Sequence, residues 1–348
     1  MIIKNLIINQ NKSILDAFKK LNKINNILDL ILFVVDSKNR VIGSLTDGDL
    51  RRYIVKNHDF TVKIKNVYNK NFSFIYDNSH FLDFENFKNN EIKILPILNK
   101  DHQLINIIEL DKFHSILPLE CVIMAGGRGK RLSPLTDKTP KPMLKINDKP
   151  ILEYNIDRLI SFGIKKIHIS VNYLAEKIEN YFGDGSSKNI KINYIKEEKF
   201  LGTAGSLSLI DKINTQNFIL MNADIFTNIN FNHMYKNHLK NSAIMSVAST
   251  DFTIDIPYAI LEEKKKRIFK LTEKPTYKYY SNAGIYILNK KLIKKIPKNI
   301  FFDITDLISK LLKEKKNIYH FPILGYWTDI GNPNDLKKVQ DDIKYFIS

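Results

Sequence analysis

The chain has 348 residues, of which 44% are hydrophobic and 26% are charged, as in globular proteins that bury a sizeable core. At roughly 100–200 residues per domain, this length predicts two domains and leaves room for a third. The single cysteine, Cys121, excludes a disulfide framework and a multi-cysteine zinc site. No segment reaches the ~18 consecutive apolar residues of a membrane span, and the N-terminus has no signal-peptide pattern. We therefore expect a cytoplasmic protein without a membrane partner.

The net charge is strongly positive, because 54 Lys and Arg residues outnumber 37 Asp and Glu residues and give +17. The excess consists mostly of lysine spread along the whole chain, and basic runs such as Lys264–Arg267 are short. No zinc-finger, RNA-recognition or helix-turn-helix pattern accompanies them. A compositional preference for lysine explains the charge better than a nucleic-acid partner does. The positive field would still attract phosphorylated substrates.

Two short α/β passages of similar length precede residue 118 and predict an internal repeat, about 1–57 and 58–115. The first passage reads as a helix that starts after Ser13, strands at 31–35 and 41–45, and a helix that starts near Thr46. The second passage echoes it with strands at 94–98 and 104–108, followed by 109–113. We therefore expect a domain over 1–118 and a second domain over 119–348.

Strands and helices alternate through the second domain. The sequence predicts strands at 120–125, 166–171, 190–195 and 218–224, and helices at 151–160, at 175–182 and after Gly202. Such alternation indicates an α/β fold with a mostly parallel sheet and helices on both of its faces. Ligands in these folds bind beyond the carboxyl ends of the strands, which is where the glycine-rich and charged residues of this chain fall.

The first strand ends in the loop Ala125-Gly-Gly-Arg-Gly-Lys-Arg. Glycines at a strand end allow backbone N–H groups to approach phosphate oxygens closely, and Lys130 and Arg131 add positive charge. The loop is neither a Walker A motif nor a dinucleotide fingerprint, and a tight strand-to-helix turn would also explain its glycines. Lys141 follows between two prolines, a rigid placement that suits a point charge on a phosphate.

A series of motifs in this order resembles the sugar-1-phosphate nucleotidyltransferases over about residues 120–335. The motifs are Ala125-Gly-Gly-Arg-Gly-Lys-Arg-Leu-Ser-Pro-Leu-Thr, Pro140-Lys-Pro-Met, Leu201-Gly-Thr-Ala-Gly-Ser, Asn222-Ala-Asp, Thr272-Glu-Lys-Pro, Asn282-Ala-Gly-Ile-Tyr and Tyr326-Trp-Thr-Asp-Ile-Gly-Asn-Pro. The resemblance implies a Rossmann-like, mostly parallel sheet of the GT-A-like type. Lys130 departs from the pattern, because the family usually has Thr or Ser there.

The resemblance implies that the phosphate of a sugar 1-phosphate displaces pyrophosphate from the α-phosphorus of a nucleoside triphosphate. Such a reaction needs positioning and charge neutralisation rather than a general base, and the eight histidines show no motif-like spacing. By this resemblance Arg131 would grip the pyrophosphate and Lys141 the α-phosphate. Asp224 and Asp329 would hold Mg²⁺, which binds one or two carboxylates plus substrate phosphates. Taken singly, each aspartate also fits a turn or helix cap.

The resemblance also assigns the remaining substrate contacts. For the sugar phosphate, Lys274 would neutralise the phosphate and Glu273 would hold sugar hydroxyls, although the two also fit a surface charge pair. The complete sugar-phosphate set is Glu273, Lys274, Asn282 and Gly284, and the nucleotide-binding set is Ala125, Gly126, Gly127, Gly129, Lys130, Arg131, Glu197, Gly202 and Thr203.

The nucleotide base is predicted from Glu197, which stands where thymidylyl-transferring relatives have Gln. A carboxylate only accepts hydrogen bonds, so it would suit the adjacent N1–H and N2–H₂ donors of guanine and indicates GTP. A CBS module ahead of the catalytic part resembles the glucosamine-1-phosphate guanylyltransferases of legionaminic acid synthesis. Alternatives are a mannose-1-phosphate guanylyltransferase, a glucose-1-phosphate thymidylyl- or uridylyltransferase, and a non-catalytic nucleotide-binding regulatory homologue.

The segment Val41-Ile-Gly-Ser-Leu-Thr-Asp-Gly-Asp-Leu-Arg-Arg resembles the end of a cystathionine-β-synthase (CBS) domain. These domains form tandem pairs, which often bind adenine nucleotides and commonly associate, so the resemblance implies a homo-oligomer. Thr46 at a helix N-terminus would meet a phosphate, and Asp49 would accept from ribose hydroxyls. Both residues also fit a helix cap. The second passage lacks this pair, having Ile108-Glu-Leu-Asp, so we do not expect two equivalent ligand sites.

Overall fold

The computed structural model describes residues 3–24, 30–77 and 81–343. The chain forms two compact units, residues 1–116 and 117–348. None of the helices in the described residues is long and apolar enough to cross a membrane. Short 3-10 helices occupy Ile3–Leu6, Ile64–Asn66, Lys130–Leu132, Lys141–Met143, Ser186–Lys188, Ser206–Leu209 and Lys290–Lys295.

The first half of the N-terminal unit is a small sheet with two helices. The sheet has the order β1 (Ile7–Asn9), β2 (Ile31–Val35), β3 (Val41–Thr46), and the helices are α1 (Ile14–Leu21) and α2 (Asp47–Asn57). The predicted helix start after Ser13 is confirmed. Its side chain accepts a hydrogen bond from the Asp16 N–H, and the Asp16 carboxylate accepts one from the Ser13 N–H.

The second half repeats the strand arrangement of the first. Its sheet has the order β4 (Ile75–Tyr76), β6 (Ile94–Leu98), β7 (Leu104–Glu109). In each half an outer strand runs parallel to the first strand of an antiparallel hairpin that contains one bulge. Helix α3 (Glu85–Asn89) is short, and β5 (Leu82–Asp83) pairs with β8 (Ser115–Ile116). The segment 109–113, which corresponds in sequence to the start of α2, contains no helix. Leu6, Phe33 and Val35 pack with Ile94 and Leu98 in one core that both halves share.

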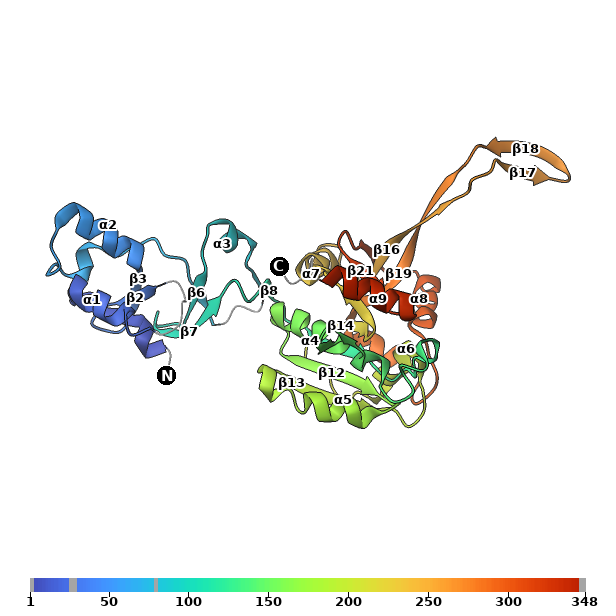
Figure 1. Ribbon diagram of the computed structural model, residues 1–348, viewed down its shortest axis with the longest axis horizontal. Coiled ribbons are helices and arrows are strands. Elements are labelled where there is room, and N and C mark those ends of the chain that lie inside the picture. The colour runs from blue at the N-terminus through green and yellow to red at the C-terminus, as the bar shows by residue number, and fades with distance from the viewer. Residues whose placement is uncertain (1–2, 25–29, 78–80, 344–348) are drawn as a thin grey trace. The chain divides into compact units, whose positions relative to one another are not determined.

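The C-terminal unit is built on a seven-stranded sheet (Figure 1), and the predicted mostly parallel fold is confirmed. The pairings of β19 with β14 and β16 are antiparallel, and the other pairings in the sheet are parallel. The strand order is β13 (Lys191–Lys196), β12 (Lys166–Val171), β9 (Glu120–Met124), β14 (Asn217–Asn222), β19 (Thr276–Asn289), β16 (Met245–Asp255), β20 (Ile318–Pro322).

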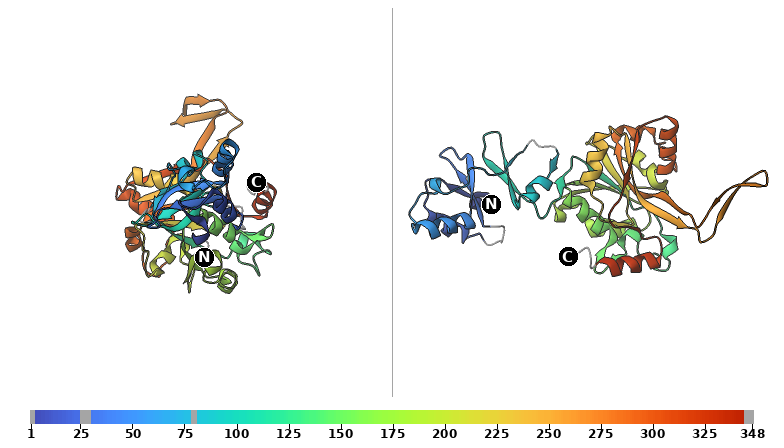
Figure 2. Two further views of the ribbon diagram at one scale, coloured as in Figure 1. Left: turned by 90° about the vertical axis from the view of Figure 1, so that its left-hand side faces the viewer. Right: turned by 90° about the horizontal axis from the view of Figure 1, so that it is seen from above.

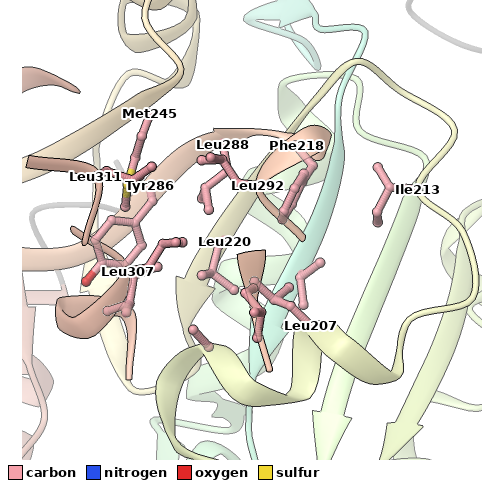
Figure 3. Packing of buried hydrophobic residues seen from close by; sticks show 14 of the residues in the cluster. Leu207, Ile213, Phe218, Leu220, Met245, Tyr286, Leu288, Leu292, Leu307 and Leu311 are labelled. Carbon is pink, nitrogen blue, oxygen red and sulfur yellow. The ribbon is translucent and has the colours of Figure 1, made fainter. Parts of the chain in front are cut away.

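Helices cover both faces of this sheet. On one face, Leu220 and Met245 pack against Leu307 and other residues of α8 (Ile304–Lys313), as Figure 3 shows. Ser246, the residue after Met245, instead contacts His238 of α7 (Phe231–Lys240). Because successive strand residues point to opposite faces, α8 and α7 cover opposite sides. The remaining elements are α4 (Ile151–Ser161), α5 (Ala175–Phe182), α6 (Gly202–Gly205), α9 (Pro333–Asp342), and the pairs β10 (Lys145–Ile146) with β11 (Lys149–Pro150) and β15 (Ile225–Thr227) with β21 (Trp327–Asp329).

Strands β16 and β19 continue beyond the sheet as a two-stranded ribbon (Figures 1 and 2). Ser249 pairs with Asn282 where the ribbon begins, and Asp255 pairs with Thr276 farther out. The ribbon ends in the hairpin of β17 (Ile260–Lys264) and β18 (Arg267–Thr272).

Candidate active site

Two aspartates from distant parts of the sequence lie side by side at the edge of the sheet. Asp224 is the second residue after β14, and Asp329 is the last residue of β21. The pairing of β15 with β21 places Ile225 opposite Asp329, and the Ile330 N–H donates to the Asp224 carbonyl at 3.0 Å. The structure therefore brings together the two carboxylates that the sequence singled out.

Lys141 lies between the two aspartates. Its ammonium forms an ion pair with the Asp224 carboxylate and lies 3.6 Å from Asp329 Oδ1. Only 10% of its side chain is exposed, because the short helix that begins at Lys141 is buried at this point. A lysine held this rigidly can replace water as the partner of an anionic phosphate.

The carboxylates retain oxygens that accept no hydrogen bond. Asp224 Oδ1 and Asp329 Oδ1 are both buried and have no hydrogen-bond partner among the described residues. Burial and the neighbouring Asp224 charge raise the pKa of Asp329, while Lys141 and Arg131 oppose this shift. Buried oxygens without partners are rare, and paired carboxylate oxygens are donors that Mg²⁺ prefers. These residues therefore fit a divalent cation that takes its other ligands from substrate phosphates. The described residues contain no group of three or more His, Cys, Asp or Glu arranged to hold a metal.

The glycines of the first loop serve different purposes. A Cβ on Gly126 would lie 2.9 Å from Glu197 Oε1, and Gly129 has a φ of +61°, so packing and backbone geometry explain these two. Gly127 has neither constraint, because its φ is not positive and, apart from its two chain neighbours, no other described residue has an atom within 4 Å of where its Cβ would be. It lines the cleft, so its lack of a side chain leaves room for a ligand to approach the backbone.

A cleft of about 260 Å³ extends from the glycine loop to Asp224 and Lys141. Arg131 lies on its rim, where its guanidinium would be 3.4 Å from a Cβ on Gly331. Gly331 was missed at the sequence level, although it follows Asp329 closely in the last motif. The cleft is lined by Met124, Ala125, Gly127, Gly129, Lys130, Arg131, Leu132, Lys141, Pro142, Ala223, Asp224 and Gly331.

Glu197 is buried directly after β13, two strands away from β9, and lies beside the glycine loop. The Ser170 hydroxyl donates to its Oε1, and the Leu201 N–H donates to its Oε2 at 2.9 Å. The Asn172 side-chain amide donates a hydrogen bond of 2.6 Å to the backbone carbonyl of Glu197. Burial raises the pKa of Glu197, and the two donors partly offset this. The sequence analysis did not predict Ser170 and Asn172 as site residues. Their position at the end of β12 could have indicated them, because β12 ends at the same edge of the parallel sheet as the glycine loop.

Gly202 and Thr203 contact the start of α8. The Thr203 N–H and hydroxyl both donate to Asp303 Oδ1, at 2.9 and 3.0 Å, and the hydroxyl accepts from the Ile304 N–H. A Cβ on Gly202, whose φ is +81°, would lie 2.8 Å from the same carboxylate oxygen. The Thr203 side chain is thus occupied by protein groups, and nucleotide contact at these two residues stays a prediction.

Comparison with known proteins agrees with this geometry. The sequence pattern of the nucleotidyl transferase family matches residues 120–345, most of the chain and the whole of the cleft. The chain belongs to the nucleotidyl transferase family. A CBS domain pattern matches residues 1–56.

Similar proteins include sugar-phosphate enzymes. D-glycero-α-D-manno-heptose 1-phosphate guanylyltransferase of Aneurinibacillus thermoaerophilus is 31% identical over 236 residues, which cover 66% of this chain and 100% of that protein. The mannose-1-phosphate guanylyltransferase catalytic subunit β of Danio rerio is 30% identical over 228 residues, 62% of each chain. The chain therefore spans less than two thirds of that relative's length. HddC of Yersinia pseudotuberculosis, solved with GMP-PN, is 27% identical with a TM-score of 0.50 and covers 65% of this chain and 99% of its own.

The residues predicted to bind the sugar phosphate divide into two groups in this nucleotidyl transferase. Gly284 lies against Asn222, two residues before the cleft residue Asp224, because a Cβ added to Gly284 would be 2.8 Å from Asn222 Nδ2. Asn282 Oδ1 accepts from the Gly284 N–H and the Tyr286 hydroxyl. Glu273 and Lys274 are exposed on the ribbon, on the far side of the segment 276–281 from Asn282. The structure of one chain does not bring these two side chains into the cleft.

In the N-terminal unit, Thr46 and Asp49 form a capping box at the start of α2. The Asp49 N–H donates to the Thr46 hydroxyl at 3.1 Å, and Asp49 Oδ2 accepts from the Thr46 N–H at 2.9 Å. Asp49 also pairs with Arg52 at 2.6 Å. The helix-cap interpretation is therefore confirmed. Thr46 lines a cavity of about 430 Å³ together with Ser44 and Asn69, so the adenine-nucleotide hypothesis stays open as a prediction.

Proposed function

We propose that the C-terminal unit transfers a guanylyl group from GTP to glucosamine 1-phosphate, giving GDP-glucosamine and pyrophosphate. The observation that supports this proposal best is the cluster of Lys141, Asp224 and Asp329, of which Lys141 and Asp224 line a cleft together with the glycine loop. A nucleoside triphosphate and a sugar phosphate carry several negative charges into one site, and this cluster provides groups that can hold them.

In the proposed reaction, a phosphate oxygen of the sugar 1-phosphate bonds to the α-phosphorus of GTP. The bond from that phosphorus to the β-phosphate bridging oxygen breaks, and pyrophosphate leaves with the electron pair. Lys141 would hold the α-phosphate, and Arg131 and the N–H groups near Gly127 would hold the leaving group. Asp224 and Asp329 would bind Mg²⁺, which when bound neutralises phosphate charge.

The choice of GTP rests on Glu197 and on the relatives. One Glu197 oxygen lies close to Gly126 at the loop, and a carboxylate there suits a base edge that offers two donors. Both relatives described above are guanylyltransferases by name, and the HddC structure contains GMP-PN. If the enzyme prefers dTTP or UTP with glucose 1-phosphate as the second substrate, Glu197 does not select guanine.

The choice of sugar has a second candidate. Glucosamine 1-phosphate rests on the combination of a CBS module with a guanylyltransferase-like domain, an argument by architecture. A manno-configured sugar 1-phosphate is favoured by the heptose enzyme, whose whole length the chain matches, and by the mannose-1-phosphate relative.

For the N-terminal unit we propose an adenine nucleotide at the cavity beside Thr46, with a regulatory effect on the cleft.

One experiment tests the catalytic proposal. Pyrophosphate release is measured with Mg²⁺ for GTP, dTTP, UTP and ATP, each paired with the 1-phosphates of glucosamine, mannose, manno-heptose and glucose. We expect the highest kcat/KM for GTP with glucosamine 1-phosphate. If GTP with a manno-sugar 1-phosphate gives the highest kcat/KM, the assignment of glucosamine 1-phosphate is wrong, while the assignment of GTP stands. Absence of release from every pair, while nucleotides still raise the melting temperature, would support a regulatory homologue.

A further inference from the structure

Helix α4 lies along the segment 223–229, which carries Asp224 and strand β15. At the start of this segment, the buried side-chain amide of Asn155 donates to the Ala223 carbonyl at 3.3 Å. At its end, the Arg158 guanidinium donates to the carbonyls of the last two residues of the segment. Asn155 and Arg158 are three residues apart and therefore neighbours on the helix surface. One helix thus holds both ends of the segment.

The attachment at Arg158 is a charged one. The side chain is half-buried, its guanidinium lies 5.4 Å from the centre of the Phe162 ring, and burial alone lowers its pKa to about 10. The group therefore stays charged at neutral pH, and hydrogen bonds from a charged donor are stronger than those from a neutral one. Because a guanidinium presents its donors in a fixed plane, it can hold two successive carbonyls in one arrangement.

The end of the segment 223–229 in turn holds the start of β21. The Asn228 N–H donates to the Tyr326 carbonyl at 3.1 Å, and Asn228 Oδ1 accepts from the Tyr326 N–H at 2.7 Å. The Thr227 hydroxyl donates to the same carbonyl at 2.8 Å. Gly325 leaves room for this arrangement, because a Cβ there would lie 2.0 Å from Asn228 Oδ1. These bonds fix the residue that precedes β21.

The relative position of the two carboxylates depends on how β15 pairs with β21. The pairing sets Thr227 opposite Trp327 and Ile225 opposite Asp329. A shift of one residue in this register would turn Asp329 to the other face of the strand pair. A smaller displacement of β21 would change the distance between Asp329 and Asp224. Helix α4 therefore acts on the acidic pair through the backbone that carries it.

A divalent cation bound by the acidic pair would be sensitive to such a displacement. Mg²⁺ requires near-ideal octahedral geometry with oxygens at ~2.0–2.1 Å, whereas Ca²⁺ accepts flexible geometry at ~2.3–2.6 Å. Replacing the groups that orient metal ligands typically costs ~10–100-fold in metal affinity or activity. Loosening of the acidic pair should therefore weaken Mg²⁺ binding more than Ca²⁺ binding.

We propose that Asn155 and Arg158 are positioning residues, which fix the spacing of Asp224 and Asp329 for Mg²⁺. Asn155 acts on Asp224 through the residue before it, and Arg158 acts on Asp329 through Asn228 and β21. The inference rests on the magnesium site of the proposed function, and it is independent of which nucleotide and which sugar react. A helix that served only the core would affect stability and leave the metal affinity unchanged.

Metal binding to the full chain tests the proposal. The Mn²⁺ dissociation constant is measured by electron paramagnetic resonance, without substrate and with a non-hydrolysable GTP analogue. Arg158→Met and Asn155→Leu each remove the donors, and each should weaken Mn²⁺ binding about tenfold. Arg158→Lys keeps a charged donor and should bind Mn²⁺ within about threefold of the unaltered chain. Unchanged Mn²⁺ affinity in Arg158→Met or in Asn155→Leu would overturn the role of that residue.

Two control variants of α4 separate positioning from stability. Asp157→Asn alters the residue next to Arg158 and removes the ion pairs with Lys149 and Lys188. Leu159→Val shortens a fully buried side chain of the same helix. Both variants should lower the melting temperature and leave the Mn²⁺ affinity within about twofold of normal, because cavity formation and lost ion pairs act on stability. Mn²⁺ affinity that falls in step with the melting temperature across all variants would overturn the proposal.

The choice of cation and the link to β21 give two further measurements. Arg158→Met should weaken Mg²⁺ binding about tenfold but Ca²⁺ binding less than about threefold, and equal losses would contradict the geometric argument. Because Arg158 acts through Asn228, Asn228→Ala combined with Arg158→Met should bind Mn²⁺ about as well as Asn228→Ala alone. Additive losses would show that Arg158 does not act through Asn228.

The unaltered chain distinguishes failure of this inference from failure of the proposed function. If it binds Mn²⁺ but releases no pyrophosphate from any substrate pair, the proposed function fails, while the Mn²⁺ measurements still decide the roles of Asn155 and Arg158. If it binds no Mn²⁺ even with the GTP analogue, the acidic pair is not a metal site and the inference is wrong.

Discussion

Replacing Gly127 by alanine should separate ligand binding from folding. Within the described part of the chain, no residue other than its two chain neighbours has an atom within 4 Å of the added Cβ. The φ of Gly127 is not positive either, so the folded chain can accept the methyl group. Fewer unfolded conformations would even raise the free energy of unfolding by ~0.4–1 kcal/mol. The same methyl group projects into the cleft, where the proposed nucleotide phosphates approach the loop backbone.

The expected loss of activity follows from the hydrogen bond that the methyl group would obstruct. A backbone N–H bond to a charged phosphate contributes ~1.5–3 kcal/mol. Losing one should therefore lower kcat/KM by ~10- to 150-fold. The assays are pyrophosphate release over a range of GTP concentrations and thermal unfolding of the same preparation. We expect an unchanged or higher melting temperature together with the lower kcat/KM.

Gly126→Ala provides the matched control from the adjacent residue. Its Cβ would lie 2.9 Å from Glu197 Oε1, and Glu197 cannot easily move because Ser170 and Leu201 hold its carboxylate. Overpacking of this kind costs ~1–3 kcal/mol, which lowers the melting temperature by several degrees. If Gly127→Ala keeps full kcat/KM, or loses as much stability as Gly126→Ala, the assignment of Gly127 to ligand contact is wrong.

Three further predictions concern other parts of the chain. Asp224→Ala should lower pyrophosphate release more than ~100-fold, because a metal contributes several kcal/mol of charge stabilisation. The circular dichroism spectrum should not change. Mg²⁺-dependent turnover within tenfold of normal would show that Asp224 is not a metal ligand. Asp49→Ala should cost ~1 kcal/mol of stability by breaking the capping box and should abolish any stabilisation by AMP or ATP, while basal turnover stays normal; undiminished nucleotide stabilisation would exclude Asp49 as a ligand. Burial lowers the pKa of His238 to about 4, whereas the unfolded value is 6.5. The unfolded state therefore binds the extra proton first, and the unfolding free energy should fall by up to ~3 kcal/mol between pH 6.5 and 4. His238→Gln should flatten this part of the pH profile, and an equally steep profile in that variant would contradict the assignment.

Local signals in the sequence predicted many individual elements correctly. Ser13 and Thr46 begin helices because their side chains cap the free N–H groups of the first turn, a property that depends only on neighbouring residues. The helix expected after Gly202 is a four-residue turn followed by a 3-10 segment. Its start is held instead by Asp303, a partner one hundred residues away that no local pattern reveals.

The chain alone indicated a mostly parallel α/β fold and which residues carry charge at the strand ends, because strand–helix alternation and motif order are properties of the sequence. Tertiary structure decided which of these residues meet. Pairing of β15 with β21 places Asp329 beside Asp224, and Lys141 lies between them. The same fold carries Glu273 and Lys274 out along the ribbon, away from the motifs they accompany in sequence. Sequence order cannot show this, since proximity depends on strand pairing across long separations and on where a strand pair leaves its sheet.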